Sequence, residues 1–468
     1  MAIEGPARPT GFGALRQEEQ PGLPLRRRLP VGGAWVVLGR VLGVGVTTLV
    51  NVAFARWLSP EDFGSFVLLS SVLAMASLLA MLGLNAALVR FVAESVGQRD
   101  LDRARRSVRL VMAVAAVSIT SVTCLAAVGL SYFGTTILGL PNVPGIVPMA
   151  VTSVVLLALL QLIAEGCRGL HEMRLASLFS GGQTGGLLSN VLFLLLIAGA
   201  VAAGKPSLST AVALNVAAMS ISLPVAIFGF AWAARTRLGP PAPKRSAGSL
   251  AVAHLLRFSV SMLTIQLLVF ATTQSDLWIA GIWCPRNELA LYGAARRLTL
   301  LVALPLQMLN LTVISSIAEL HGQHRHRDLE QMLRRAALLA ALPSVVASVV
   351  LIVWGGPVLE LLFGSFFRQA ALPLGILGVG QLFLVAAGSC GCLLEMTGNQ
   401  TGSLLVNLAT ALALAVVGTW AARQFGILGL AVASTSIIAA QSITLWLLAK
   451  RIVGVWTHPT LRPSLTWS

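Results

Sequence analysis

The 468-residue chain is too apolar for a soluble protein. Hydrophobic residues make up 56% of it and charged residues only 11%, whereas a soluble domain has about 25% charged residues. Runs of about 20 nearly uncharged residues, each long enough to cross a bilayer, recur along the chain and do not alternate as barrel strands would. This excludes a soluble enzyme with an anchor and predicts an all-α polytopic membrane protein.

We count about twelve apolar spans, joined by short links of which several carry Pro, Gly or Asn, as helix ends do. Each is a predicted transmembrane helix, and together they fill most of the chain. The spans lie near 33–56, 64–89, 108–132, 146–166, 177–202, 209–234, 258–282, 289–316, 337–354, 371–394, 403–421 and 427–449.

The Lys and Arg residues behind the net charge of +16 are distributed unequally between the two sides of the membrane. With the amino terminus placed in the cytosol, the inside segments carry 25 Lys and Arg residues, the outside segments carry five, and only Arg40, Arg296 and Arg297 remain within spans. This asymmetry follows the positive-inside rule and predicts that both termini are cytosolic. Orientation and attraction to anionic lipid explain the basic excess, so nucleic acid is not an expected partner.

The two halves of the chain match at a shift of about 225 residues. The matches include Asn51 with Asp276, Pro60 with Pro285, Arg109 with Arg334, and the segment 167–173 with 390–396. We therefore expect two pseudo-symmetric six-helix bundles around a central cavity, a plan that recurs in transporters. The predicted divisions are a tail 1–32, a first bundle 33–234, a cytosolic linker 235–257, a second bundle 258–450 and a tail 451–468.

Several stretches in both halves resemble one family. They are Ala55-Arg-Trp-Leu-Ser-Pro-Glu-Asp-Phe-Gly64, Leu82–Glu94, Gln274–Gly281, Leu291–Arg297 with Pro305-Leu306, and Glu395–Gln400. Together they are similar to bacterial polysaccharide flippases of the O-antigen and exopolysaccharide branch of the multidrug/oligosaccharidyl-lipid/polysaccharide (MOP) superfamily. The resemblance implies a flippase that moves undecaprenyl-diphosphate-linked oligosaccharide, by alternating access, from the cytosolic to the outer leaflet of the bacterial inner membrane. Its product would be O-antigen, capsule or exopolysaccharide.

Two other functions stay open. A cation-coupled multidrug or metabolite exporter of the same superfamily needs an acidic residue in the membrane, for which Asp276 is the central candidate, while the first span carries Asn51 and no acid. A scaffold for glycan assembly proteins, which are further candidate partners, would need no transport site. The chain has no Gly-rich nucleotide loop, paired catalytic carboxylates or nucleophile–base pair, so we expect neither an enzyme nor a cofactor.

Asp276, Arg296 and Arg297 are the sharpest candidates for a site, because ionisable groups within spans are costly and usually functional. Asp276 and Arg296 lie equally far from Arg286 in the turn between spans seven and eight, so they should lie at similar depth. One arginine is expected to pair with Asp276, which would set the charge of the site, and the other to bind the diphosphate. A purely structural ion pair is the alternative.

Other charged residues lie nearer the cytosolic face. Arg40 and Arg90 are further candidates for the diphosphate, with interfacial snorkelling or a helix-end contact as the alternative. Glu94, Glu172, Glu319 and Glu395 recur at the cytosolic ends of paired spans and are candidate gate residues, unless they are ordinary interfacial charges. The histidines near residue 324 lack acidic or cysteine partners at ligand spacing, so we expect a solvated basic loop and no metal.

Overall fold

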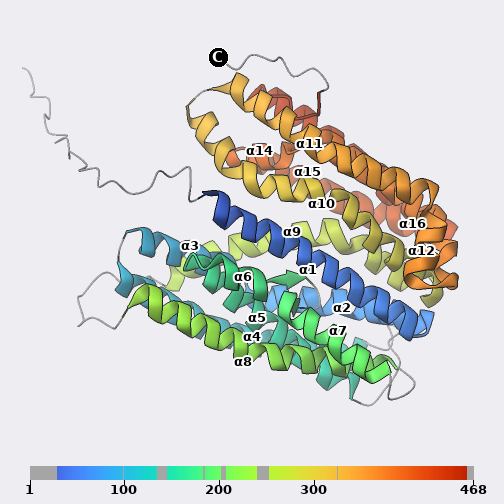
Figure 1. The fold of residues 1–468 in the computed structure, drawn as a ribbon, viewed down its shortest axis with the longest axis horizontal. Coiled ribbons are helices and arrows are strands. Elements are labelled where there is room, and N and C mark those ends of the chain that lie inside the picture. The colour runs from blue at the N-terminus through green and yellow to red at the C-terminus, as the bar shows by residue number, and fades with distance from the viewer. Residues whose placement is uncertain are drawn as a thin grey trace, which may run out of the picture.

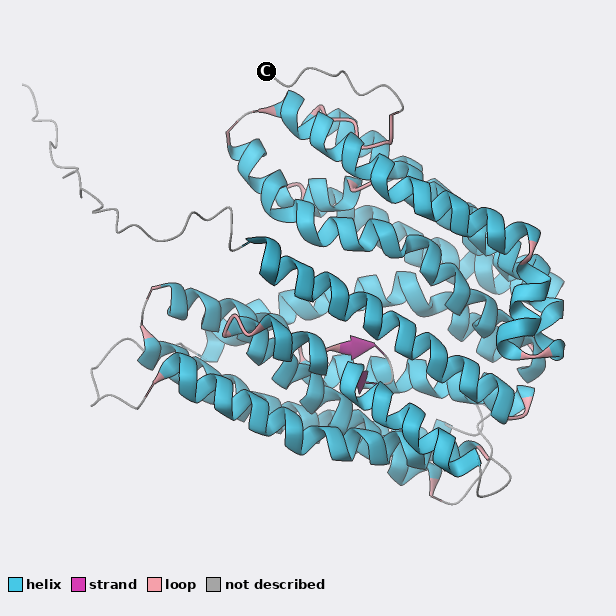
Figure 2. Cartoon of the chain, viewed as in Figure 1, coloured by secondary structure: helices cyan, strands magenta, loops and turns pink. Residues whose placement is uncertain are grey.

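The computed structural model describes residues 29–460 apart from 99, 134–144, 183–184, 202–206, 240–251 and 324. That part is almost wholly helical (Figure 2). The elements are α1 Leu29–Trp57, α2 Pro60–Met81, α3 Leu84–Gly97, α4 Leu101–Phe133, α5 Ile146–Gly169, α6 Met173–Phe179, β1 Gly181–Gly182, β2 Gly185–Gly186, α7 Leu187–Val201, α8 Leu208–Leu238, α9 Val252–Trp283, α10 Arg286–Gly322, α11 His326–Val353, α12 Gly355–Phe363, η2 Ser365–Ala370, α13 Ala371–Ala387, α14 Cys390–Met396, α15 Gln400–Ala413, η3 Leu414–Gly418 and α16 Thr419–Val453.

The helices supply the predicted number of membrane passes. Ten stretches in the described part are long and apolar enough to cross a membrane, and the shorter apolar α7 supplies another pass. The stretch 400–453 counts twice because the chain reverses at Gly426, whose φ of 61° and ψ of −148° break the helix. Gly429 then packs against Ala421. About twelve passes result, which confirms the predicted all-α membrane fold.

The helices form two bundles with the same opening motif. Helices α2–α8 gather on one side of the molecule and α10–α16 on the other, while α1 and α9 cross between them (Figure 1). Pro60 opens α2 and Pro285 directly precedes α10, which places the repeated prolines where a missing N–H costs nothing. We refer to α1–α8 as the first bundle and to α9–α16 as the second.

The bundles approach each other at one end and separate toward the other. Helices α1 and α10 lie close beside α12 and diverge toward the end where the carboxyl terminus lies (Figure 1). We call the end where the bundles meet the convergent end; it holds the turns before α2 and α10. We call the opposite end the divergent end; it holds the turns before α4 and α11. Along the molecule, α9 keeps contact with α2 and α3 of the first bundle.

Three spans that the sequence predicts as continuous are broken. Span two breaks at Leu82 and Gly83, with φ of 48° and 72°; span ten breaks at Gly388, with φ of 70°. Span five is interrupted by two short antiparallel strands, in which Gly181 pairs with Gly186. Glycine permits these conformations, and non-helical backbone persists at membrane depth only where protein surrounds it.

The ends of the second bundle differ from the predicted divisions. Within the predicted tail, Thr457 is fully buried and donates to Ala387 O at 2.6 Å, while Trp456 N donates to a Glu330 oxygen at 3.3 Å. The chain up to residue 460 therefore packs on the second bundle. Within the predicted linker 235–257, α8 continues to Leu238 and α9 begins at Val252. The predicted tail 1–32 lies mostly outside the described residues, as does 461–468.

Gly83 offers a test of the break in span two. A Cβ at this position would lie 2.2 Å from Ser259 O on α9, and the positive φ disfavours any L side chain. We expect Gly83→Ala to lower the stability of the detergent-purified protein by about 1–2 kcal/mol or more. Gly43→Ala is the control, because a Cβ there meets nothing within 4 Å. Equal melting temperatures for the two variants, measured by tryptophan fluorescence, would contradict the strained contact.

Candidate functional site

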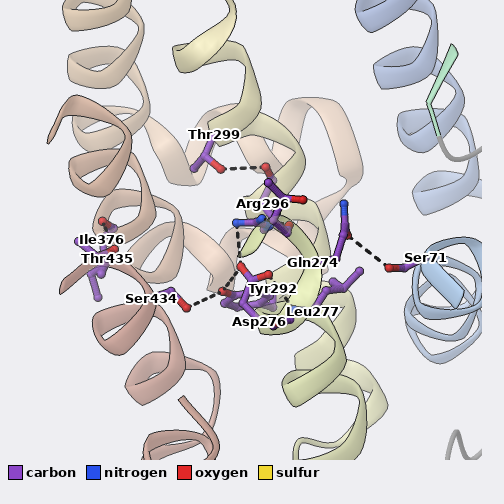
Figure 3. A network of polar contacts seen from close by, with 12 residues as sticks. Ser71, Gln274, Asp276, Leu277, Tyr292, Arg296, Thr299, Ile376, Ser434 and Thr435 are labelled. Atoms are coloured by element: carbon purple, nitrogen blue, oxygen red, sulfur yellow. Dashed lines mark hydrogen bonds and ion pairs between the residues drawn. The ribbon is translucent and has the colours of Figure 1, made fainter. Parts of the chain in front are cut away.

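Asp276 is the centre of a buried polar network between α9 and α10 (Figure 3). Its side chain is 1% exposed, and its Oδ2 lies 2.7 Å from Arg296 Nη1. The Tyr292 hydroxyl donates to the same oxygen at 2.9 Å, and the Leu277 N–H donates to Oδ1 at 2.9 Å. Both carboxylate oxygens therefore have partners, as a charge buried at membrane depth requires.

Arg296 is held in place by both helices. In addition to Asp276, it donates to Thr273 O on α9, and its side chain is only 14% exposed. Asp276 and Arg296 thus meet at the same depth. The sequence left open which arginine pairs with Asp276, and the structure assigns that contact to Arg296. The pair joins α9 to α10 and gives the guanidinium a fixed position.

Arg297 leaves α10 in a different direction from Arg296. It follows Arg296 on α10, so its side chain leaves the helix about 100° further around, and it is partly buried. The two adjacent charges therefore serve different surroundings. Arg296 belongs to the interior of the second bundle, whereas Arg297 is presented along another face of α10.

A line of polar contacts between the bundles was not singled out from the sequence. Trp278 Nε1 donates to Ser71 Oγ at 2.8 Å, and Ser71 Oγ donates to Gln274 Oε1 at 3.3 Å (Figure 3). Asn85 and Gln266 exchange amide contacts at 3.2 and 3.5 Å. We call these five residues the polar seam. The available signal was that amides stand within apolar spans, where each needs a partner.

The predicted diphosphate candidates near the cytosolic face lie apart. Arg40 has an exposed side chain on α1, and no hydrogen bond or ion pair reaches it from the described residues. It lies seven residues before Thr47, whose hydroxyl accepts from Asn190 on α7, so both lie on the same face of α1. Arg90 instead lies 4.6 Å from the centre of the Phe258 ring on α9, a cation–π contact between the bundles.

The four candidate gate glutamates are not brought together in this conformation. Glu94 lies 3.7 Å from Arg103 and Glu172 lies 2.7 Å from Arg237, in each case within the first bundle. Glu319 and Glu395 belong to the second bundle, where both are exposed. Glu319 accepts from Gln323 at 3.3 Å, one turn along its own helix. Their role as gate residues stays a prediction.

Metal ligands are not grouped in the part of the chain that the structure describes. No set of three or more His, Cys, Asp or Glu residues is placed there to hold an ion. His321 and His326 have ring centres 5.6 Å apart, and His324 lies outside the described residues.

Comparison with known families decides the affiliation. The polysaccharide biosynthesis protein family matches residues 31–319, which is well over half of the chain. The chain belongs to this family. The matched region covers the first bundle, α9 and nearly all of α10, and therefore includes Asp276, Arg296 and Arg297. A second model, for the MatE family, matches residues 261–421. Curated protein sequences include no match.

Solved structures of multidrug transporters and of a lipid flippase have a similar fold. An inward-facing multidrug resistance MATE transporter of the MOP superfamily has a TM-score of 0.68 at 15% identity, over 88% of this chain and 94% of that one. The lipid II flippase MurJ, in an inward closed conformation, has a TM-score of 0.67 at 12% identity, over 90% and 87%. The Vibrio cholerae MATE transporter VcmN has 0.65 at 15%, over 92% and 98%. This polysaccharide biosynthesis protein therefore shares the fold of these membrane proteins.

The ion pair predicts a specific pattern of stability. Asp276→Asn leaves Arg296 charged and without its carboxylate, so it should destabilise the purified protein by about 3–5 kcal/mol. Adding Arg296→Gln removes the orphaned charge and should restore much of that loss. Thermal melting in detergent measures both. A double variant as unstable as the sum of the two single variants would show that the residues do not act as a pair.

Proposed function

We propose that this transporter flips undecaprenyl-diphosphate-linked oligosaccharide from the cytosolic to the outer leaflet of the bacterial inner membrane. The match to the polysaccharide biosynthesis family over residues 31–319 carries the proposal. The glycan would enter O-antigen, capsule or exopolysaccharide. The positive-inside pattern supports an orientation with both termini in the cytosol, which places the divergent end there.

The physical problem of a flippase fits the placement of the charges. A diphosphate must cross about 30 Å of hydrocarbon, while the polyprenyl tail stays in lipid. Arg40 on α1 and Arg297 on α10 stand on the two helices that diverge toward the proposed cytosolic end (Figure 1). Guanidinium groups bind phosphate oxygens in a bidentate manner, so a diphosphate that entered between these helices would meet a cation on each side. Asp276 fixes Arg296, and through it the helix turn that carries Arg297.

In an alternating-access mechanism, the two similar bundles would move as rigid bodies relative to each other. Rocking of one bundle against the other would close the divergent end and open the convergent end, while each bundle keeps its own packing. Glu94, Glu172, Glu319 and Glu395 would meet arginines of the opposite bundle when the cytosolic end closes. In the proposed cycle, the present conformation is the one that accepts substrate from the inner leaflet.

A cation-coupled exporter is the second candidate, favoured by the MatE match over residues 261–421. Coupling would require an acid that a cation can reach. The Arg296 guanidinium and the Tyr292 hydroxyl both contact Oδ2 of Asp276. Asp276 could therefore bind a cation only if these contacts were broken. A scaffold for glycan assembly proteins is the third candidate function. It predicts that the charged residues within the membrane can be neutralised without an effect on function.

The two arginines on the divergent helices test the flippase proposal. In a host that lacks the gene, lipid-linked oligosaccharide should accumulate on the cytosolic face, as measured with a lectin on oriented vesicles. Arg40→Gln and Arg297→Gln should each lower the rate of flipping about tenfold or more, because each loses a charged hydrogen bond to the diphosphate. The scaffold hypothesis predicts full complementation by both.

Arg423→Gln is the matched control, because Arg423 stacks at 3.5 Å over Trp283 near the convergent end and takes no part in the proposed site. It should complement normally. An unchanged leaflet distribution in the deletion strain would contradict the flippase. Drug accumulation assays on Asp276→Asn would then test the exporter.

A further inference from the structure

An aromatic contact joins the bundles at the convergent end. Phe63, in the first turn of α2, is fully buried against two rings of the second bundle. Its ring centre lies 5.6 Å from Phe367, edge to face, and 6.5 Å from Phe363. Phe363 ends α12 and Phe367 lies in η2, and each is 1% exposed. Edge-to-face pairs of this kind are favourable beyond the area that they bury.

A charge from the first bundle caps a helix of the second. Arg56, in the last turn of α1, donates from Nε to Leu362 O at 2.8 Å and from Nη2 to Leu361 O. These carbonyls belong to the last turn of α12, where the helix has no partner for them, and a cation is favourable at that end of the helix dipole. The Arg56 side chain is exposed. If the cap opened at the membrane surface, water would replace it at small cost.

Glycine lets α2 approach the second bundle closely beside these contacts. A Cβ on Gly64 would lie 2.6 Å from Arg286 O, at the start of α10, and one on Gly281 would lie 2.7 Å from a Leu68 methyl. The convergent end is thus joined by a ring contact, a helix cap and a close approach of end turns. All three join separate bundles, so they can part without unfolding either one.

We propose that Arg56 and Phe63, together with α12 and η2, form a latch that holds the convergent end shut and is released in each transport cycle. The inference rests on the proposed function, because a flippase that works by alternating access must part this end. The polar seam is the complementary element. Ser71 lies eleven residues after Pro60, about 16 Å along the helix and so near mid-depth, close to where a rocking axis passes. The seam persists, whereas the latch breaks.

Distance measurements between the bundles test the latch without any substrate. Spin labels at Glu61 and Gln369, which are exposed residues of α2 and η2, report the convergent end; labels at Gln98 and Gln323 report the divergent end. The five native cysteines are first replaced by Ala or Ser. Phe63→Ala and Arg56→Gln should each raise the fraction with long 61–369 distances about tenfold, with shorter 98–323 distances in the same molecules.

Two control variants remove the same groups outside the latch. Phe228→Ala truncates a ring that is 75% exposed on α8. Arg423→Gln removes a cation that stacks at 3.5 Å over the Trp283 ring, within the second bundle. Both should keep the wild-type distances. If Phe63→Ala and Arg56→Gln also keep them, while eluting as folded protein, the latch proposal is overturned.

A covalent closure provides a second test that does not depend on the stability of the variants. Glu61→Cys and Gln369→Cys are joined by a short cleavable crosslinker in vesicles that contain lipid-linked oligosaccharide. Flipping should stop and return when the linker is cleaved. Flipping at the untethered rate under complete crosslinking would overturn the latch and leave the flippase intact. Distances that respond as expected in a protein that flips no lipid-linked oligosaccharide would support the latch and overturn the function.

Discussion

The hydrocarbon core of a bilayer offers no water to a polar atom, and the structure of this chain follows from that constraint. Backbone groups are satisfied within helices almost everywhere. Where a span breaks, at Gly83, Gly185–Gly186 or Gly388, the break lies against other helices or, at Gly388, against the returning carboxyl-terminal segment. Side chains obey the same constraint. Asp276 forms an ion pair with Arg296, and the amides of Asn85 and Gln266 in the polar seam form a hydrogen bond between the bundles.

The same constraint separates the membrane arginines by role. Arg296 is committed to Asp276 and to the Thr273 carbonyl, so its charge stabilises the junction of α9 and α10. Arg40 and Arg297 carry the proposed work of binding the diphosphate, from two helices that diverge. This division gives the three membrane arginines different roles. One charge is neutralised for structure, and the net positive charge that remains suits an anionic substrate.

The polar seam and the latch both join the bundles but differ in kind, and the difference matters for motion. The polar seam runs at membrane depth, where an amide that loses its partner has no substitute, so the seam resists separation. The latch lies at the end of the helices, where water can replace the Arg56 cap. A transporter built from two rigid bundles needs one junction that holds and another that opens. The polar seam, at membrane depth, is the junction that holds, and the latch, at the helix ends, is the junction that opens.

The sequence by itself determined the membrane class, the number of passes, the repeat and the candidate charges, because each depends on composition along a single helix. Hydropathy identifies a span without reference to its neighbours. Asp276 and Arg296 lie equally far from a turn in the sequence, which predicts that they lie at the same depth. The tertiary structure alone decided that Arg296 is the partner, that Tyr292 and Leu277 complete the network, and that spans two, five and ten are broken. It also decided that Phe63 meets Phe367 and that Arg56 caps α12. These features depend on which faces of helices distant in sequence come together, and one-dimensional patterns of apolar residues do not encode that choice.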